Sequence, residues 1–120
     1  MRVLVVEDDA SIRLLVGELL RDEGHDVVLA SDHAEALALA AGERFHACLC
    51  DGLGRDHLEL TDDDRDTLAR LNAAVPTVLC TAHSWAQGLA PGAAGVAGVV
   101  PKPFEAAAVL AALARVADRP

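Results

Sequence analysis

The chain has 120 residues, of which 52% are hydrophobic, and a formal net charge of −9. Its length suits one domain with its own core, and the hydrophobic fraction argues against disorder. The negative charge argues against direct nucleic-acid binding, and no apolar run is long enough to cross a bilayer. We therefore expect one cytoplasmic domain over residues 1–120, without an output domain and without membrane contact.

The first half of the chain alternates between short apolar runs and helical patterns. Val3–Val6 is a continuous apolar run, typical of a strand buried on both faces of a parallel sheet. The helix that follows should end at Gly24. Its predicted buried stripe consists of Ile12, Leu15, Val16 and Leu19.

Two further strands and a helix are predicted before residue 52. Residues 27–30 form the second predicted strand, and residues 47–50 form the third, which ends at Asp51. Between them, Asp32 can cap a helix that ends near Gly42. The residues expected on its inward side are Leu37, Ala38 and Ala41.

The second half continues the alternation. Thr61 should open a third helix, and strands are predicted at residues 77–81 and 96–100, before a final helix at 104–117. The predicted core residues of the two helices are Leu68, Leu71, Val109, Leu113 and Val116. A fourth helix is expected within residues 84–98, but four glycines and Pro91 predict that it is short or distorted. This alternation predicts an α/β fold with a doubly wound, five-stranded parallel sheet.

Polar residues follow four of the predicted strands. Glu7, Asp8 and Asp9 follow the first strand, Asp51 ends the third, Thr81 ends the fourth and Lys102 follows the fifth. The carboxyl ends of parallel strands form one rim, where open α/β sheets bind ligands. Carboxylates held together repel one another, and a hard divalent cation such as Mg²⁺ relieves that repulsion. A carboxylate beside a cation, an ammonium and a hydroxyl is suited to accept a phosphoryl group.

These motifs resemble those of the receiver domain of response regulators over essentially the whole chain. They are Val5–Asp9, Asp51 after a strand, Thr81-Ala82 after another, and Lys102-Pro103-Phe104. The resemblance implies the sheet order 2-1-3-4-5 and phosphorylation of Asp51 by a sensor histidine kinase or histidine phosphotransfer protein. It also implies Mg²⁺, or in its place Mn²⁺, bound by Glu7, Asp8, Asp51 and the backbone carbonyl of Leu53.

The resemblance also implies roles for the residues around the acceptor. Thr81 and Lys102 would contact the phosphoryl group, Leu53 and His83 would tune its loss, and the bond before Pro103 would be cis. Phosphorylation would switch a protein-interaction face around residues 84–117. Val99 departs from the family, which usually has an aromatic residue that rotates on activation. We therefore expect output through ordering and disordering of residues 84–98 rather than through ring rotation.

Two other functions compete with this interpretation. The first is a pseudo-receiver that binds proteins without being phosphorylated, which Val99 and the altered loop after Asp51 favour. The second is a phosphohydrolase with an aspartate nucleophile, which ranks lower because Leu53 stands where a second carboxylate would be needed. We expect no independent substrate turnover. Cys48, Cys50 and Cys80 are predicted to be buried, reduced thiols, with a redox link between Cys50 and Cys80 as the alternative.

Overall fold

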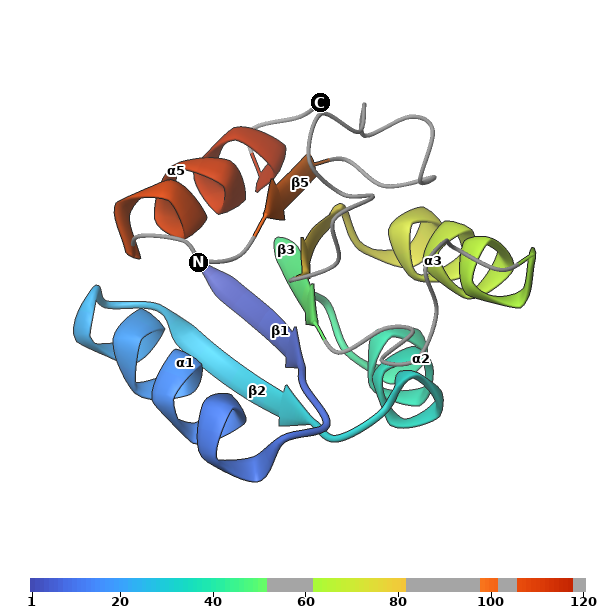
Figure 1. Cartoon of the computed structure of the whole chain (residues 1–120), viewed down its shortest axis with the longest axis horizontal. Coiled ribbons are helices and arrows are strands. Elements are labelled where there is room, and N and C mark those ends of the chain that lie inside the picture. Colours follow the sequence, from blue (N-terminus) through green and yellow to red (C-terminus); the bar gives the residue numbers. More distant parts are fainter. Residues whose placement is uncertain (52–61, 82–97, 102–105, 118–120) are drawn as a thin grey trace.

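The computed structural model of the protein describes residues 1–51, 62–81, 98–101 and 106–117. Five parallel strands form one sheet in the order β2-β1-β3-β4-β5 (Figure 1). The strands are β1 (Arg2–Val6), β2 (Asp26–Ala30), β3 (Ala47–Asp51), β4 (Thr77–Thr81) and β5 (Gly98–Pro101). The predicted sheet and its order are confirmed.

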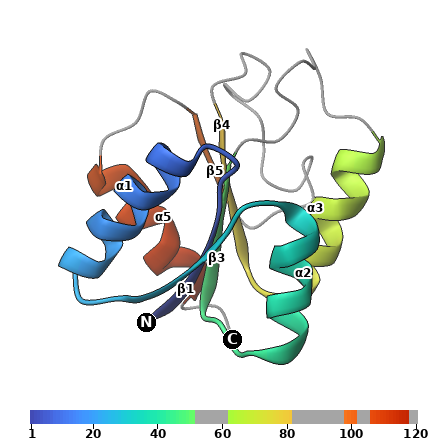
Figure 2. The same ribbon diagram turned by 90° about the horizontal axis from the view of Figure 1, so that it is seen from below.

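Helices cover both faces of the sheet. They are α1 (Ala10–Asp22), α2 (His33–Gly42), α3 (Asp62–Ala74) and α5 (Ala106–Ala117). Seen along the sheet, α1 and α5 lie on one face and α2 and α3 on the other (Figure 2). The doubly wound architecture is therefore confirmed. The predicted fourth helix within residues 84–98 and the helix start at Thr61 lie outside the described residues, apart from Gly98 in β5.

Each face of the sheet has its own apolar core. The α1/α5 face buries Val3 and Val5 of β1, whereas the α2/α3 face buries Leu4 and Val6 of the same strand. This alternation is what a strand covered on both sides requires, and it explains the uninterrupted apolar run at the start of the sequence. None of the described helices has the length and hydropathy to span a membrane.

Helix α1 turns a different face inward from the one that the apolar pattern predicts. Ile12 is 37% exposed and Leu15 is 66% exposed, whereas Val16 and Leu20 are buried. The inward stripe is displaced by one residue and includes Gly17, which lies close to β2: a Cβ atom there would come within 3.1 Å of a Leu29 methyl group. The predicted stripe of Ile12, Leu15, Val16 and Leu19 is thus wrong except at Val16, since Leu19 is only half-buried.

Helices α1 and α2 follow their predicted boundaries more closely than their predicted faces. Gly24 ends α1 with a φ of 88°, a left-handed conformation that glycine adopts at no steric cost. Asp32 caps α2 by accepting a hydrogen bond from the Glu35 N–H at 2.8 Å. In α2 the buried residue is Ala36, with Leu37 packed beside it, whereas Ala38 and Ala41 are exposed, contrary to prediction.

The predicted core of the last two helices is confirmed. Its members are Leu68, Leu71, Val109, Leu113 and Val116, none more than 4% exposed. The three cysteines are also buried, and in the described strands none forms a disulfide. Cys50 packs in the core on the α2/α3 face and Cys80 in the core on the α1/α5 face. A redox link between these two thiols would have to cross the sheet, so that alternative is excluded.

The revised orientation of α1 predicts a contrast between two leucines of the same helix. Leu20→Ala should lower the free energy of unfolding by about 2–5 kcal/mol, because Leu20 is fully buried and its removal leaves a cavity. Leu15→Ala should change it by about 0.5 kcal/mol or less, because Leu15 is exposed. Urea unfolding of both variants measures this, and equal losses would contradict the observed face.

Candidate functional site

The strand register brings three predicted site positions to one edge of the sheet. Val6 pairs with Cys50, so Glu7 and Asp51 follow at the same level on adjacent strands. Asp51 pairs in turn with Cys80, and Thr81 comes one residue later on β4. Neighbouring strands lie about 4.8 Å apart. The backbones of Glu7, Asp51 and Thr81 therefore stand side by side at the carboxyl edge.

Glu7 is a buried acid at this edge, with only 3% of its surface exposed. Its backbone N–H donates to the Ala30 carbonyl of β2 at 3.1 Å, which extends the sheet by one residue. Its side-chain Oε1 accepts a hydrogen bond from the Asp9 N–H at 3.0 Å. Burying an ionised carboxylate costs free energy unless other groups compensate for its charge. The burial of Glu7 is therefore not explained by packing alone.

Asp8 and Asp9 continue the loop between β1 and α1 with different surroundings. Asp8 is exposed at the rim. Asp9 is the N-cap of α1, and its Oδ1 accepts hydrogen bonds from the N–H groups of Ser11 at 2.9 Å and Ile12 at 3.1 Å. Aspartate is one of the residues preferred at this position, because its side-chain oxygen satisfies free N–H groups of the first turn. Of the three consecutive acids, Glu7 and Asp8 are thus the two that do not cap the helix.

Arg13 contacts this loop, although no sequence pattern indicates it. Its Nη1 donates to the backbone carbonyl of Glu7 at 2.9 Å, in a partly buried position. Arg13 lies on the inward stripe of α1, three residues before Val16. An arginine within an apolar stripe is a weak signal, because a long side chain that leads its charge out to solvent would look the same.

Several predicted site residues lie outside the described part of the chain. Leu53, His83, Lys102 and Pro103 are the residues concerned, together with the predicted cis bond before Pro103. Asp51, Thr81 and Val99 have a described backbone within β3, β4 and β5, while their side chains are not described. The structure therefore brings together Glu7, Asp8 and the strand ends that carry Asp51 and Thr81.

The donor chemistry at this edge fits a hard divalent cation. Among the described side chains, no three His, Cys, Asp or Glu residues gather in a metal-binding group. The described contribution is two carboxylates, from Glu7 and Asp8, next to the strand end that carries a third at Asp51. Oxygen ligands in this number are what Mg²⁺ takes from a protein while it keeps several waters.

A histidine contacts the residue before Asp51. His33 Nε2 lies 3.3 Å from the Sγ atom of Cys50, between the first turn of α2 and the end of β3. No sequence pattern indicates this pair, because 17 positions separate the two residues. Cys50 is fully buried, so the contact connects α2 to β3 one residue before the carboxyl edge of the sheet.

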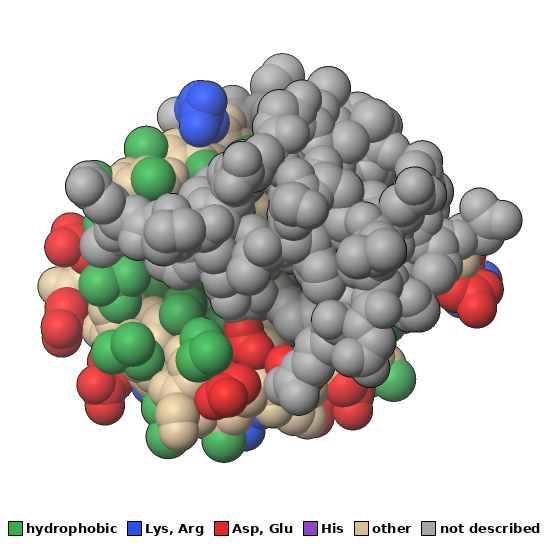
Figure 3. Space-filling model, viewed as in Figure 1, with side chains coloured by type: hydrophobic (Ala, Val, Ile, Leu, Met, Phe, Trp, Pro, Cys, Tyr) green, Lys and Arg blue, Asp and Glu red, His purple; other side chains and the backbone are tan. Residues whose placement is uncertain are grey.

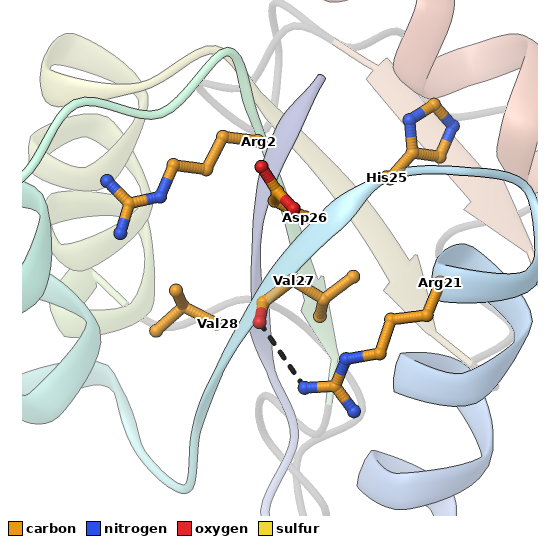
Figure 4. Close-up of a pocket in the computed structure, with 6 residues that line it drawn as sticks. All are labelled: Arg2, Arg21, His25, Asp26, Val27 and Val28. Carbon is orange, nitrogen blue, oxygen red and sulfur yellow. Dashed lines mark hydrogen bonds between the residues drawn. The ribbon is translucent and has the colours of Figure 1, made fainter.

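A hollow of about 510 Å³ lies at the opposite end of the sheet and does not belong to this site. Its lining includes Arg2, Arg21 and His25, together with the first residues of β2 (Figure 4). Arg21 donates to the Val27 carbonyl at 3.3 Å, and Arg2 pairs with Glu43. Figure 4 shows the two guanidinium groups on opposite sides of β2, so they do not converge on one ligand.

The Cys48 thiol beneath the site is held in its neutral form by burial. Cys48 is fully buried, and burial raises its pKa from 9.0 to about 12, against a smaller lowering by a hydrogen bond with Thr77. A neutral thiol is a poor nucleophile and a poor metal ligand. Cys48 is thus a packing residue, as predicted.

Comparison with known proteins places the chain among regulatory proteins. The family model described as the response regulator receiver domain matches residues 3–114. The response regulator MprA of Mycobacterium avium is 34% identical over 113 residues, which are 92% of this chain and 48% of MprA. The chain spans less than half of the length of the curated relatives that it matches.

Solved structures show the same fold. The chemotaxis response regulator CheY4 of Vibrio cholerae superposes with a TM-score of 0.74 at 30% identity, covering 96% of this chain and 97% of CheY4. The receiver domain of the sensor histidine kinase PA1611 from Pseudomonas aeruginosa PAO1 superposes with a TM-score of 0.78 at 24% identity, covering 98% of each chain. That structure has a magnesium ion coordinated in its active site cleft.

The raised pKa of Cys48 predicts a specific alkaline loss of stability. Above about pH 9 the thiol ionises in the unfolded chain but stays protonated in the folded one, so its contribution to stability falls as the pH rises. Between about pH 9 and about pH 10 the free energy of unfolding should fall by about 1 kcal/mol more in the wild type than in Cys48→Ala. Urea unfolding at both pH values measures this, and parallel losses would refute the assignment.

Proposed function

The chain belongs to the response regulator receiver domain family, and from that premise we propose that it accepts a phosphoryl group on Asp51 in a Mg²⁺-dependent reaction. The observation that carries the proposal is the register of β1, β3 and β4. It sets Glu7, Asp51 and Thr81 side by side at the carboxyl edge, with Asp8 next to them. Each of these strands comes from a different segment of the chain, so local sequence bias does not explain their meeting.

The proposed reaction is a displacement at phosphorus. A carboxylate oxygen of Asp51 attacks the phosphorus of a phosphohistidine, a P–O bond forms and the P–N bond breaks. The electron pair of the broken bond stays on the imidazole nitrogen of the donor. The product is an acyl phosphate on Asp51. The phosphoryl group is lost later to water, so the chain turns over no independent substrate.

Glu7 and Asp8 have the task of holding the cation that this reaction needs. The bound Mg²⁺ supplies positive charge that offsets the negative charge of the transferring group. As in the family, we assign direct binding of the ion to Asp8, which is exposed at the rim, and binding through a bound water to Glu7, which is buried. The carbonyl of Leu53 and the carboxylate of Asp51 complete the proposed protein ligands. Mn²⁺ has the same preference for oxygen and should replace Mg²⁺.

The remaining roles are carried over from the family to matching positions of this chain. Thr81 donates a hydroxyl hydrogen bond to the phosphoryl group, and Lys102 supplies an opposing positive charge. Leu53 and His83 influence how long the acyl phosphate survives. Phosphorylation then alters the protein-interaction face around residues 84–117, where Val99 replaces the usual aromatic residue.

The phosphodonor is proposed to be a sensor histidine kinase or a histidine phosphotransfer protein, and α1 is proposed to be its docking surface. Ile12, Leu14 and Leu15 are the exposed large hydrophobic residues of the described chain, at 37%, 56% and 66%. All three lie in the first two turns of α1, directly after the acidic loop that consists of Glu7, Asp8 and Asp9. Figure 3 shows hydrophobic side chains gathered over α1 beside acidic ones. Exposed apolar surface next to a reaction site is typical of a protein interface.

Phosphorylation of Asp51 can be tested with a small phosphodonor. Incubation with Mg²⁺ and phosphoramidate should add the mass of one phosphoryl group to the wild type and none to Asp51→Asn, because the amide is not nucleophilic. Intact-protein mass spectrometry measures this. The matched control is Asp26→Asn, an exposed aspartate at the amino end of β2, which should be modified like the wild type.

Two outcomes of that assay, and one separate turnover measurement, distinguish the candidate functions. Absence of modification in the wild type would favour the pseudo-receiver. Modification that persists in Asp51→Asn would place the acceptor elsewhere. Steady release of phosphate from a generic phosphomonoester would favour the phosphohydrolase.

Docking on α1 predicts that Leu15→Ser separates two kinds of phosphodonor. Phosphotransfer from a histidine kinase that phosphorylates the wild type should fall about tenfold, since a central apolar contact is worth more than about 1 kcal/mol. The rate with phosphoramidate should not change, because the small donor needs no docking surface. Rapid-quench measurements with both donors test this.

The control for docking is Ala38→Ser, which introduces the same hydroxyl on an exposed position of α2. Helix α2 lies on the opposite face of the sheet (Figure 2), so both rates should match the wild type. Equal loss with both donors in Leu15→Ser would instead indicate damage to the site itself.

A further inference from the structure

We propose that Arg13 is a positioning residue for the acidic loop. By contacting this loop, Arg13 holds Glu7 and Asp8 in the geometry that binds the divalent cation. The inference rests on the proposed function, because it concerns the cation of that same site. Its direct observation is the hydrogen bond of 2.9 Å from Arg13 Nη1 to the Glu7 carbonyl.

The Glu7 backbone is fastened from two sides. On one side its N–H donates to Ala30 of the edge strand β2 at 3.1 Å. On the other side its carbonyl accepts the hydrogen bond from Arg13. The carbonyl belongs to the peptide group that joins Glu7 to Asp8, and that group is planar. Fixing its oxygen therefore fixes the plane from which the Asp8 backbone continues.

The side chain of Glu7 closes a second connection within the loop. Its Oε1 accepts from the Asp9 N–H, and Asp9 in turn caps α1 through Ser11 and Ile12. The Asp9 carbonyl accepts the first helical hydrogen bond, from the Arg13 N–H at 2.9 Å. Arg13 thus contacts the loop through both its backbone and its side chain. Asp8 lies between Glu7 and Asp9 in the chain, and both of these neighbours are held by these contacts.

Helix packing explains why an arginine can reach this carbonyl. Gly17 lets α1 lie close to β2, and Val16 and Leu20 anchor the helix in the core. Arg13 lies on the same inward stripe one turn earlier, over the end of β1. A guanidinium that donates to a carbonyl in a partly buried position forms a charge-assisted hydrogen bond, which is stronger than a neutral one.

The charge of Arg13 and its positioning of the ligands would change the Mg²⁺ affinity in opposite directions. A positive charge close to carboxylates repels an incoming cation, so removing charge alone would tighten Mg²⁺ binding. Removing a group that orients the ligands would weaken it, commonly by about tenfold to a hundredfold for residues that support metal ligands. The direction of the change therefore decides between the two roles.

The test compares Arg13→Ala with Arg21→Ala by isothermal titration calorimetry with Mg²⁺. Arg21 is a matched control: it lies in the same helix, carries the same charge and donates to a strand carbonyl, that of Val27, at the far end of the sheet. We expect Arg13→Ala to weaken Mg²⁺ binding by about tenfold and Arg21→Ala to leave it within about twofold. Arg13→Lys, which keeps one donor for the single carbonyl, should recover most of the affinity.

A second measurement needs no metal. In the metal-free protein, hydrogen exchange of the Asp9 amide should be faster in Arg13→Ala than in Arg21→Ala, because the loop that holds its acceptor is released. With phosphoramidate, Arg13→Ala should need about tenfold more Mg²⁺ for half-maximal rate, while the rate at saturating Mg²⁺ stays within about twofold of the wild type.

The outcomes distinguish this inference from the proposed function. If the wild type binds no Mg²⁺, the proposed function fails. If the wild type binds Mg²⁺ and Arg13→Ala binds it equally or more tightly, the positioning role is overturned and the proposed function stands. Should Arg13→Ala fail to fold, Arg13→Lys decides, because a loss of affinity beyond about tenfold in that folded variant would contradict a single-donor role.

Discussion

Parallel pairing of strands buried on both faces is the constraint on which this molecule depends. Because every strand runs in the same direction, all carboxyl ends lie at one edge, and residues far apart in the chain meet there without any local signal. The same burial requires apolar side chains on both faces, which leaves the strand ends as the place for polar groups. The buried acid Glu7 stands where the apolar run of β1 stops.

Those parts of the fold that follow from two-sided burial could be predicted from the sequence, and those that follow from helix packing could not. The run at Val3–Val6 is apolar on both faces, so it predicts a strand that is buried on both faces. Helix α1 offers two stripes, one through Ile12 and Leu15 and one through Arg13, Val16 and Leu20. Hydrophobicity alone selects the first. The structure has the second facing inward, where Gly17 lies close to Leu29, and this close approach is a tertiary contact that hydrophobicity does not indicate.

The residues in and around the candidate site also divide into those that the sequence predicts and those that it does not. Glu7 and Asp8 are visible in the sequence because acids that directly follow a buried strand rarely serve packing. Arg13 and His33 are not, because each acts through a single atom on a partner with no periodic relation to it: a carbonyl in one case and the Cys50 sulfur in the other. Contacts to backbone atoms leave the partner's residue type undetermined, so sequence patterns do not register them.

Helix α1 has different tasks on its two sides. On its inward side, Val16 and Leu20 bind it to the sheet and Arg13 reaches the acidic loop, whereas Ile12 and Leu15 face outward. Exposed leucines contribute little to the stability of the folded domain, so their gathering on one surface is explained better by a partner protein. Under the proposed function, a donor protein on α1 would press on the helix whose N-cap and arginine hold the cation ligands. Docking and cation binding would then share one rigid element, whereas output would depend on the other edge of the sheet, at β5 and α5. Under the proposed function, separate parts of the fold would accept the phosphoryl group and report it, so Val99 in place of an aromatic residue would not by itself disturb the acceptor site.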